Sequence, residues 1–261
     1  KSTSLYAFLR RIYSPEIKIL TIEEPIEYHL EGITQTQTNP DRGYDFLEGL
    51  KSALRQDPDV IMVGEIRDGE TAKIAVESSL TGHLVFSTLH TNNAAGVVPR
   101  LIDLGVNPKI LASALSLSIA QRLTRKLCNN CKVKRAVTKE EEELIRNTLE
   151  RAERLGKNLA EYDVTAKQKI ELYTAPGCET CSGLGYKGRI GVFEAILVNE
   201  ELQNIMPNNP SEREIKKIAE KQGILNMVED GLIKCILGVT SIEELKKVVD
   251  IYEYAEDDPV K

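Results

Sequence analysis

Short runs of apolar, often β-branched residues alternate with longer segments of helical spacing in the first half of the chain. The apolar runs, each followed by a polar turn, are 17–22, 60–63 and 84–88. Apolar residues at consecutive positions are typical of strands that helices cover on both faces. The segments around them predict helices over 44–56, 70–80, 93–105 and 108–127. Strands that alternate with helices predict an α/β fold with a parallel-type sheet.

The second half of the chain changes to charged, helix-forming sequence. A charge-rich insert at 132–170 predicts a helix over 139–158, and the apolar run 190–198 predicts a short strand. Apolar spacing near 3.6 then predicts three more helices, over 211–223, 225–238 and 241–249. The first and last of these begin with Ser and have Glu three residues later, as capping boxes do. We therefore expect three domains, an α/β core over 1–127, a subdomain over 128–198 and a helical region over 199–261.

Four of the five cysteines form two Cys-x-x-Cys pairs, Cys128 with Cys131 and Cys178 with Cys181. Two thiolates at this spacing can bind one tetrahedral Zn²⁺, and a second pair completes a closed Cys₄ site. We therefore predict that these four residues hold a structural Zn²⁺ in the 128–198 subdomain, with metal-free thiols as the alternative. Cys235 stands in an apolar run and is expected to be a small buried residue.

The composition argues against several classes of protein. The net charge is −6 and only 122–127 is locally basic, which argues against a protein that binds nucleic acids broadly. No run approaches the length of an apolar membrane span, and the N-terminus lacks the pattern of a secretory signal. We therefore expect a cytoplasmic protein without a membrane span.

Residues suited to binding phosphate and magnesium stand at the N-terminus and after a predicted strand. Lys1, Ser2 and Thr3 match the end of the pattern G-x-x-x-x-G-K-[ST], in which Lys reaches the β- and γ-phosphates and a hydroxyl binds Mg²⁺. Glu65 comes just after the apolar run 60–63, at the end of a strand where open α/β sheets bind ligands. A carboxylate there can hold the Mg²⁺ shell or orient an attacking water.

The other two predicted strands also end in polar residues. Glu23, Glu24 and Glu27 follow the first strand, and such closely spaced carboxylates favour a cation or a Mg²⁺·nucleotide complex, with an exposed acidic turn as the alternative. His90 follows the third strand and can hydrogen-bond a γ-phosphate. We expect these acids and His90 to converge on one magnesium-triphosphate pocket.

Taken together, these motifs resemble those of the C-terminal ATPase domain of bacterial type II secretion and type IV pilus assembly ATPases, the secretion superfamily of P-loop motors. KST resembles the end of the Walker A loop, IEEPIE the Asp box, DPDVIMVGEIRD the Walker B segment and GHLVFSTLHTN the His box. The paired cysteines resemble the zinc subdomain of this family. The resemblance implies a RecA-like P-loop NTPase core, a Cys₄ zinc-binding subdomain and a C-terminal helical region.

The resemblance also implies roles for individual residues. Glu23 matches the favoured water-activating base, and Glu65 matches the Walker B glutamate that helps to organise Mg²⁺ and water. Glu24 stands where Asp is usual in the family, and Arg55 matches an arginine placed near the nucleotide at subunit boundaries. The resemblance also places His90 among the catalytic residues. The implied cofactors are ATP, Mg²⁺ and Zn²⁺.

The function that the resemblance implies is ATP hydrolysis coupled to assembly of a type II secretion pseudopilus or a type IV pilus. Members of this family form homohexamers that act at the inner membrane, where they contact a platform protein and cytoplasmic adaptor proteins. We expect no specific nucleic-acid partner. The CxxC pairs favour an assembly motor over a retraction motor. Because the sequence starts at the Walker A lysine, we expect it to be part of a longer protein. A motor fragment without turnover, and a zinc-stabilised scaffold or nucleic-acid-binding module, are the alternatives.

Overall fold

The computed structural model describes residues 1–252, which form two compact units. Unit 1 comprises Lys1–Ser118 and Val198–Ile215, and unit 2 comprises Ile119–Leu197 and the described residues from Lys216 on. The domain boundaries predicted after residues 127 and 198 stay a prediction. Within the described part of the chain, no helix combines the length and the apolar character that crossing a membrane requires.

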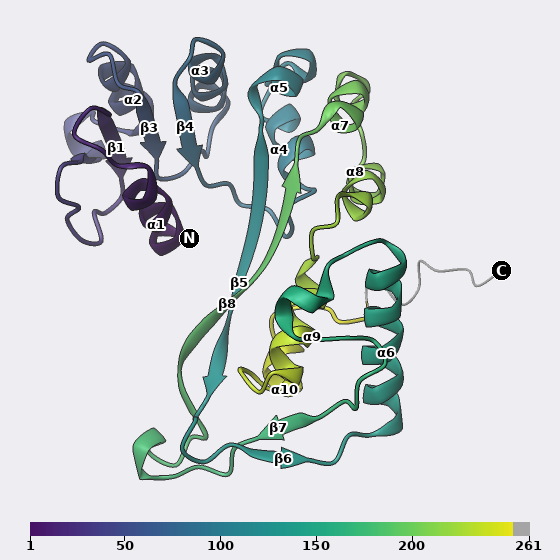
Figure 1. Cartoon of the computed structure of the whole chain (residues 1–261). Helices are drawn as coiled ribbons and strands as arrows, with labels where there is room; N and C mark the ends of the chain where they lie inside the picture. Colours follow the sequence, from purple (N-terminus) through teal and green to yellow (C-terminus); the bar gives the residue numbers. More distant parts are fainter. Residues whose placement is uncertain (253–261) are drawn as a thin grey trace. The chain divides into compact units, whose positions relative to one another are not determined.

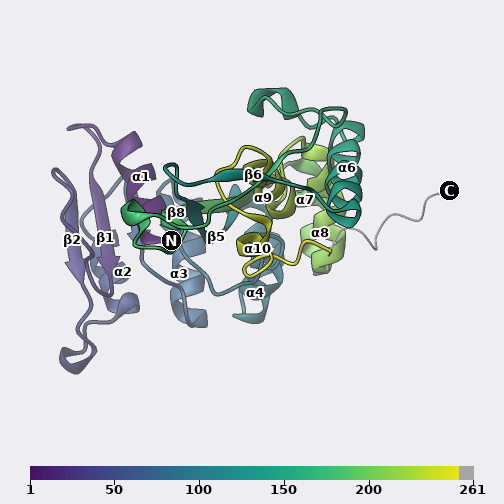
Figure 2. The same cartoon turned by 90° about the horizontal axis from the view of Figure 1, so that it is seen from below.

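A parallel four-stranded sheet forms the centre of unit 1, in the order β2-β1-β3-β4 (Figures 1 and 2). Its strands are β1 (Ile19–Glu23), β2 (Thr34–Gln37), β3 (Val60–Val63) and β4 (Leu84–Ser87). Every residue of β1 and β3 is buried, as the consecutive apolar residues predict. The predicted parallel sheet is confirmed, although β2, whose sequence is TQTQ, was not predicted.

Unit 1 also contains α-helices. They are α1 (Ser2–Ile12), α2 (Phe46–Leu54), α3 (Gly69–Leu80), α4 (Val97–Asp103), α5 (Pro108–Ala114) and α7 (Glu200–Ile205). The Asp45 and Asp68 carboxylates accept backbone N–H bonds at the starts of α2 and α3, which satisfies donors that a helix N-terminus leaves free. Tyr6 and Leu9 of α1 are fully buried in one cluster with residues of β1 and β3, so α1 is fixed against the sheet.

The helix predicted over 108–127 is wrong beyond Ala114. There α5 ends, and the following residues form β5 (Leu117–Leu127), which pairs with β8 (Tyr186–Leu197) in a two-stranded sheet (Figure 1). Leu, Gln, Arg and Lys are good helix formers, so local propensity favours a helix here. Pairing with a strand far along the chain overrides that preference.

Unit 2 packs its helices into a separate core. It contains β6 (Val133–Arg135), paired antiparallel with β7 (Leu172–Thr174), and the helices α6 (Lys139–Arg154), α9 (Met227–Ile236) and α10 (Ile242–Leu245); α8 (Glu212–Ala219) begins in unit 1 and ends in unit 2. Ile145 and Leu149 of α6 and Cys235 of α9 are fully buried in this core, which confirms the prediction for Cys235. The buried Lys157 ammonium lies 2.7 Å from a carboxylate oxygen of the equally buried Glu229, so neither charge is unpaired.

The two predicted capping boxes have different outcomes. Ser211 and Glu214 exchange both bonds of the box, with Ser211 N donating to Glu214 Oε2 over 2.8 Å and Glu214 N donating to Ser211 Oγ over 3.4 Å. Ser241 accepts the backbone N–H of Glu244, but the Glu244 carboxylate instead accepts two hydrogen bonds of 2.6 Å from Arg125 of β5. These bonds from Arg125 lower the pKa of Glu244 to about 2, against an ordinary value of 4.5.

Glu244→Gln should weaken the acid dependence of stability. A carboxyl whose folded pKa lies below its unfolded pKa contributes stability above pH 4.5, and this contribution is lost as the pH falls from 4.5 towards 2. Urea unfolding midpoints between pH 7 and pH 3 should therefore change less with pH in the variant than in the wild type. Glu143→Gln, at an exposed position of α6 beyond its first turn, is the control and should keep the wild-type slope. If the unfolding midpoint of Glu244→Gln changed with pH as much as that of the wild type, the lowered pKa of Glu244 would be contradicted.

Candidate active site

The carboxyl ends of three strands of unit 1 are aligned. Ile22 of β1 pairs with Val63 of β3, and Val63 pairs with Ser87 of β4. The alignment continues beyond the strands, because Gly64 N donates to Ile22 O over 2.8 Å and Thr88 Oγ1 donates to Gly64 O over 2.7 Å. A Cβ at Gly64 would lie 3.1 Å from the Ile22 carbonyl oxygen, so the close approach favours glycine.

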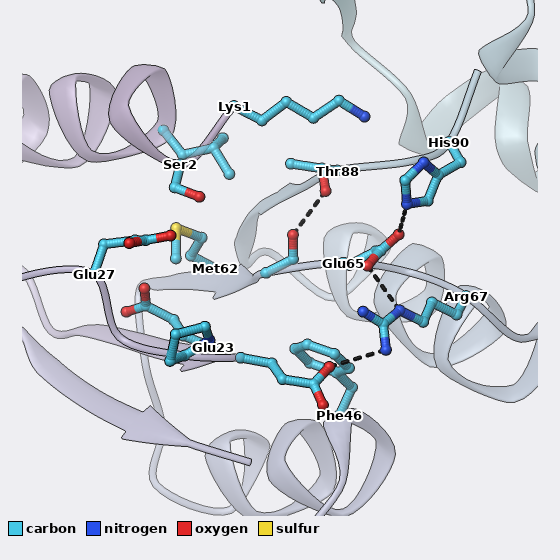
Figure 3. A pocket seen from close by; sticks show the side chains of 14 residues that line it. Lys1, Ser2, Glu23, Glu27, Phe46, Met62, Glu65, Arg67, Thr88 and His90 are labelled. Atoms are coloured by element: carbon cyan, nitrogen blue, oxygen red, sulfur yellow. Dashed lines mark hydrogen bonds and ion pairs between the residues drawn. The ribbon is translucent and has the colours of Figure 1, made fainter. Parts of the chain in front are cut away.

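A cavity of about 230 Å³ lies at this edge of the sheet (Figure 3). Six of the predicted site residues line it, namely Lys1, Ser2, Glu23, Glu24, Glu65 and His90. The other lining residues are Leu5, Pro25, Glu27, Phe46, Met62, Gly64, Arg67 and Thr88. Two predicted residues do not line the cavity: Thr3 is exposed on α1, and Arg55 is exposed at the C-terminal end of α2. The structure therefore brings the predicted acids, Lys1 and His90 to one place.

The N-terminal end of α1 contributes positive charge to this cavity. Lys1 is the residue before the helix and Ser2 is its first residue. The Lys1 ammonium donates to the Leu89 carbonyl oxygen over 2.6 Å, so its side chain extends over the loop that carries His90 (Figure 3). The dipole of α1 adds to the charge of Lys1, and together they favour an anion.

Glu23 is held by neutral hydrogen-bond donors. Its side chain is buried, and Oε1 accepts from Thr21 Oγ1 over 2.5 Å and from Gln35 Nε2 over 3.0 Å. Its Oε2 accepts from the Tyr6 hydroxyl. Burial, and then the bond to Glu23, raise the pKa of Tyr6 to about 12, so the hydroxyl keeps its proton at neutral pH. These three donors fix the Glu23 carboxylate in position.

Glu65 is held by side chains that can carry positive charge. Figure 3 shows its carboxylate between His90, which pairs with Oε1, and Arg67, whose Nε lies 2.7 Å from Oε2. Arg67 also reaches Glu24, with Nη1 2.9 Å from Oε2, and its guanidinium lies 5.8 Å from the centre of the Phe46 ring. The bond to Glu65 is the main cause that raises the pKa of Arg67.

Sequence reasoning missed the residues that hold the two glutamates. Thr21 could have been found, because it stands two residues from Glu23 on the same strand, where side chains at that spacing share a face. Arg67 stands two residues from Glu65 but beyond the end of β3, where no such rule applies. Tyr6 belongs to an apolar helix stripe that indicates packing, and Gln35 belongs to the strand that was not predicted. No local pattern indicates that either residue contacts Glu23.

The four paired cysteines gather in unit 2. One Sγ atom from each of Cys128, Cys131, Cys178 and Cys181 lies within 4.8 Å of all the others, and the shorter separations are 3.8–3.9 Å. These are the distances of a tetrahedral thiolate site, because ligands about 2.3 Å from Zn²⁺ stand about 3.8 Å apart. Burial opposes ionisation of Cys181, but N–H groups of Cys178 and Gly185, each 3.2 Å from its sulfur, outweigh it and lower the pKa to about 6. The donor set fits a thiophilic metal.

Tyr6→Phe should destabilise unit 1 by about 2 kcal/mol, because the buried Glu23 carboxylate loses a donor and no apolar contact is removed. Chemical unfolding at pH 7 measures this change. Tyr28→Phe is the matched control, since its ring packs edge-on against Tyr6 but is 42% exposed, and it should change stability by less than about 0.5 kcal/mol. Equal stabilities of the two variants would show that the bond to Glu23 contributes nothing.

Comparison with known proteins agrees with this geometry. Residues 1–247 match the family described as "Type II/IV secretion system protein". The chain is 45% identical to the type IV pilus assembly ATPase PilB of Thermus thermophilus, in an alignment that covers 94% of this chain and 26% of that protein. It is also 45% identical to the type II secretion system ATPase E of Vibrio cholerae, in an alignment that covers 95% of this chain and 46% of that protein.

A solved structure, the ATPase DotB of Legionella pneumophila, has the same fold. It superposes with a TM-score of 0.61 at 24% identity, over 95% of this chain and 56% of that one. The chain spans less than half of the length of the two curated relatives above. Because the family match covers almost all of the sequence, the chain belongs to the type II/IV secretion system protein family.

Proposed function

We propose that the chain is the catalytic part of an ATPase motor that couples ATP hydrolysis to assembly of a type II secretion pseudopilus or a type IV pilus. The observation that carries this proposal is the convergence of Lys1, Glu23, Glu65 and His90 on one cavity. Relatives with 45% identity are named as ATPases of these two machines, which supports it.

In this proposal the phosphate groups of ATP bind beside the N-terminal end of α1. Lys1 and the positive end of the α1 dipole would bind β- and γ-phosphate oxygens, and Thr3 completes the phosphate-binding pattern. The oxygens of Ser2, Glu24 and Glu65 suit Mg²⁺, which prefers hard oxygen ligands. When bound, Mg²⁺ supplies charge neutralisation on the transferred phosphoryl group.

The acid-base chemistry belongs to the carboxylates. Glu65 would orient the attacking water, and Glu23 would take its proton from a position that Tyr6, Thr21 and Gln35 fix. His90 would hydrogen-bond the γ-phosphate. Arg55, which is exposed outside the cavity, would act on the site of a neighbouring subunit.

The assembly proposed for the chain follows from its family. We infer a homohexameric ring with sites at subunit boundaries, located in the cytoplasm at the inner membrane and contacting a platform protein and cytoplasmic adaptor proteins. The CxxC pairs support an assembly motor rather than a retraction motor. The net charge of −6 argues against a nucleic-acid partner, because proteins that follow a phosphate backbone usually carry a concentrated basic surface.

The Cys₄ cluster would hold Zn²⁺ as a structural ion. Four thiolates leave no coordination position open for a substrate, so the metal has no catalytic role. The ligands come from the end of β5 and from the segment before β8, and the metal would tie these two parts of unit 2 together.

Glu65→Gln should keep nucleotide binding but reduce turnover by at least about a hundredfold, because the amide cannot organise Mg²⁺ and water as the carboxylate does. Phosphate release is measured in a version that carries a glycine-rich loop before Lys1, and the chain without that loop is measured beside it. Glu31→Gln, an exposed change outside the cavity, is the control and should retain full turnover. Unchanged turnover in Glu65→Gln would remove Glu65 from the mechanism.

Elemental analysis of the purified chain should find about one zinc per chain. The metal should be absent from the Cys128→Ser/Cys181→Ser variant, because two thiolates cannot hold it in a closed site. Cys235→Ala, which removes a buried sulfur outside the cluster, should keep the metal. A wild-type chain free of zinc and of other thiophilic metals would overturn the assignment.

A further inference from the structure

Arg67 joins two of the carboxylates that line the cavity. Its Nη1 lies 2.9 Å from Glu24 Oε2, and its Nε lies 2.7 Å from Glu65 Oε2. The other oxygen of Glu65 pairs with His90. A divalent cation that binds Glu24 Oε2 and Glu65 Oε2 must therefore compete with the guanidinium that bridges them.

The exposure of these side chains indicates which partner moves. The Arg67 side chain is 59% exposed, whereas that of Glu65 is 14% exposed at the end of β3. Exposed ion pairs contribute little to stability, so Arg67 can leave for solvent at low cost while the sheet edge keeps Glu65 in place. Arg67 is thus the exchangeable member of the pair.

Phe46 gives the guanidinium a defined position. The Arg67 guanidinium carbon lies 5.8 Å from the centre of the Phe46 ring, within the range of a cation–π contact. Phe46 is the first residue of α2, and Asp45 before it caps that helix, so the backbone that carries the ring is held by secondary structure. The contacts with Glu24, Glu65 and Phe46 hold Arg67 over the acidic side of the cavity.

We propose that Arg67 is a positioning residue that occupies the place of the divalent cation between Glu24 and Glu65, and that the cation displaces it on binding. This inference rests on the proposed nucleotide site. Before the cation arrives, the single charge of Arg67 reduces the repulsion between the two carboxylates, and so keeps them in the geometry in which the cation meets them.

The test measures Mn²⁺ binding to the 261-residue chain by electron paramagnetic resonance in the absence of nucleotide. Arg67→Gln should bind Mn²⁺ about tenfold more tightly than the wild type, because the competing charge is gone. Arg67→Lys should lie between the two, since an ammonium is a point charge that cannot bridge both carboxylates as a planar guanidinium does.

The control variant separates competition from a general effect of charge. Arg42→Gln changes the net charge equally at an exposed position that does not line the cavity, and it should bind Mn²⁺ as the wild type does. A second readout is the Arg67 Nε–H signal in the NMR spectrum of the wild type, which should shift as Mg²⁺ is added because the bond to Glu65 breaks.

The outcomes separate this inference from the proposed function. If Glu65→Gln weakens Mn²⁺ binding but Arg67→Gln leaves it unchanged or weaker, the role of Arg67 is refuted and the nucleotide site stands. An equal gain in Arg42→Gln and Arg67→Gln also refutes it. If neither Glu65→Gln nor any Arg67 variant changes Mn²⁺ binding, the cavity is not a cation site, and the proposed function fails together with the inference.

Discussion

The parallel register of β1, β3 and β4 is the constraint on which the cavity depends. Ile22, Val63 and Ser87 lie side by side, so the residues after them leave the sheet at one edge. A slip of one residue would turn every side chain of a strand to the opposite face and separate Glu65 from Glu23. The hydrogen bond from Gly64 to Ile22, and the absence of a side chain at Gly64, maintain this register beyond the last paired residues.

Glu23 and Glu65, which lie at this edge of the sheet, are held by different kinds of hydrogen-bond donor. Glu23 is 3% exposed and accepts from a phenol, a hydroxyl and an amide, none of which carries a charge. Glu65 pairs with Arg67, whose charge compensates its own. Neutral donors fix a carboxylate, whereas an exposed cation can exchange with another cation. This difference agrees with the proposed roles, in which Glu23 is a fixed proton acceptor and Glu65 is a metal ligand whose present partner, Arg67, can exchange.

The sequence predicts the parts of this site that depend on local pattern. Consecutive apolar residues locate β1, β3 and β4, and the acids after β1 and β3 and His90 after β4 then belong to one edge. Contacts between distant segments escape the same reasoning. Tyr6 and Gln35 meet Glu23 only after α1 packs on the sheet and β2 joins it, and β5 is a strand because β8 pairs with it. In each of these cases a tertiary partner, absent from the local window, decides the outcome.

The cysteine cluster raises the opposite question, because its members are obvious in the sequence while their ligand is not. All four thiols are free, yet their sulfur atoms lie within 4.8 Å of one another, and N–H donors already favour the thiolate of Cys181. Thiolates at such separations repel each other unless a cation lies among them. A disulfide would require sulfur atoms about 2.05 Å apart, far closer than the 3.8–3.9 Å observed. The four sulfur atoms are therefore too far apart for disulfides and lie at separations that fit a tetrahedral metal site.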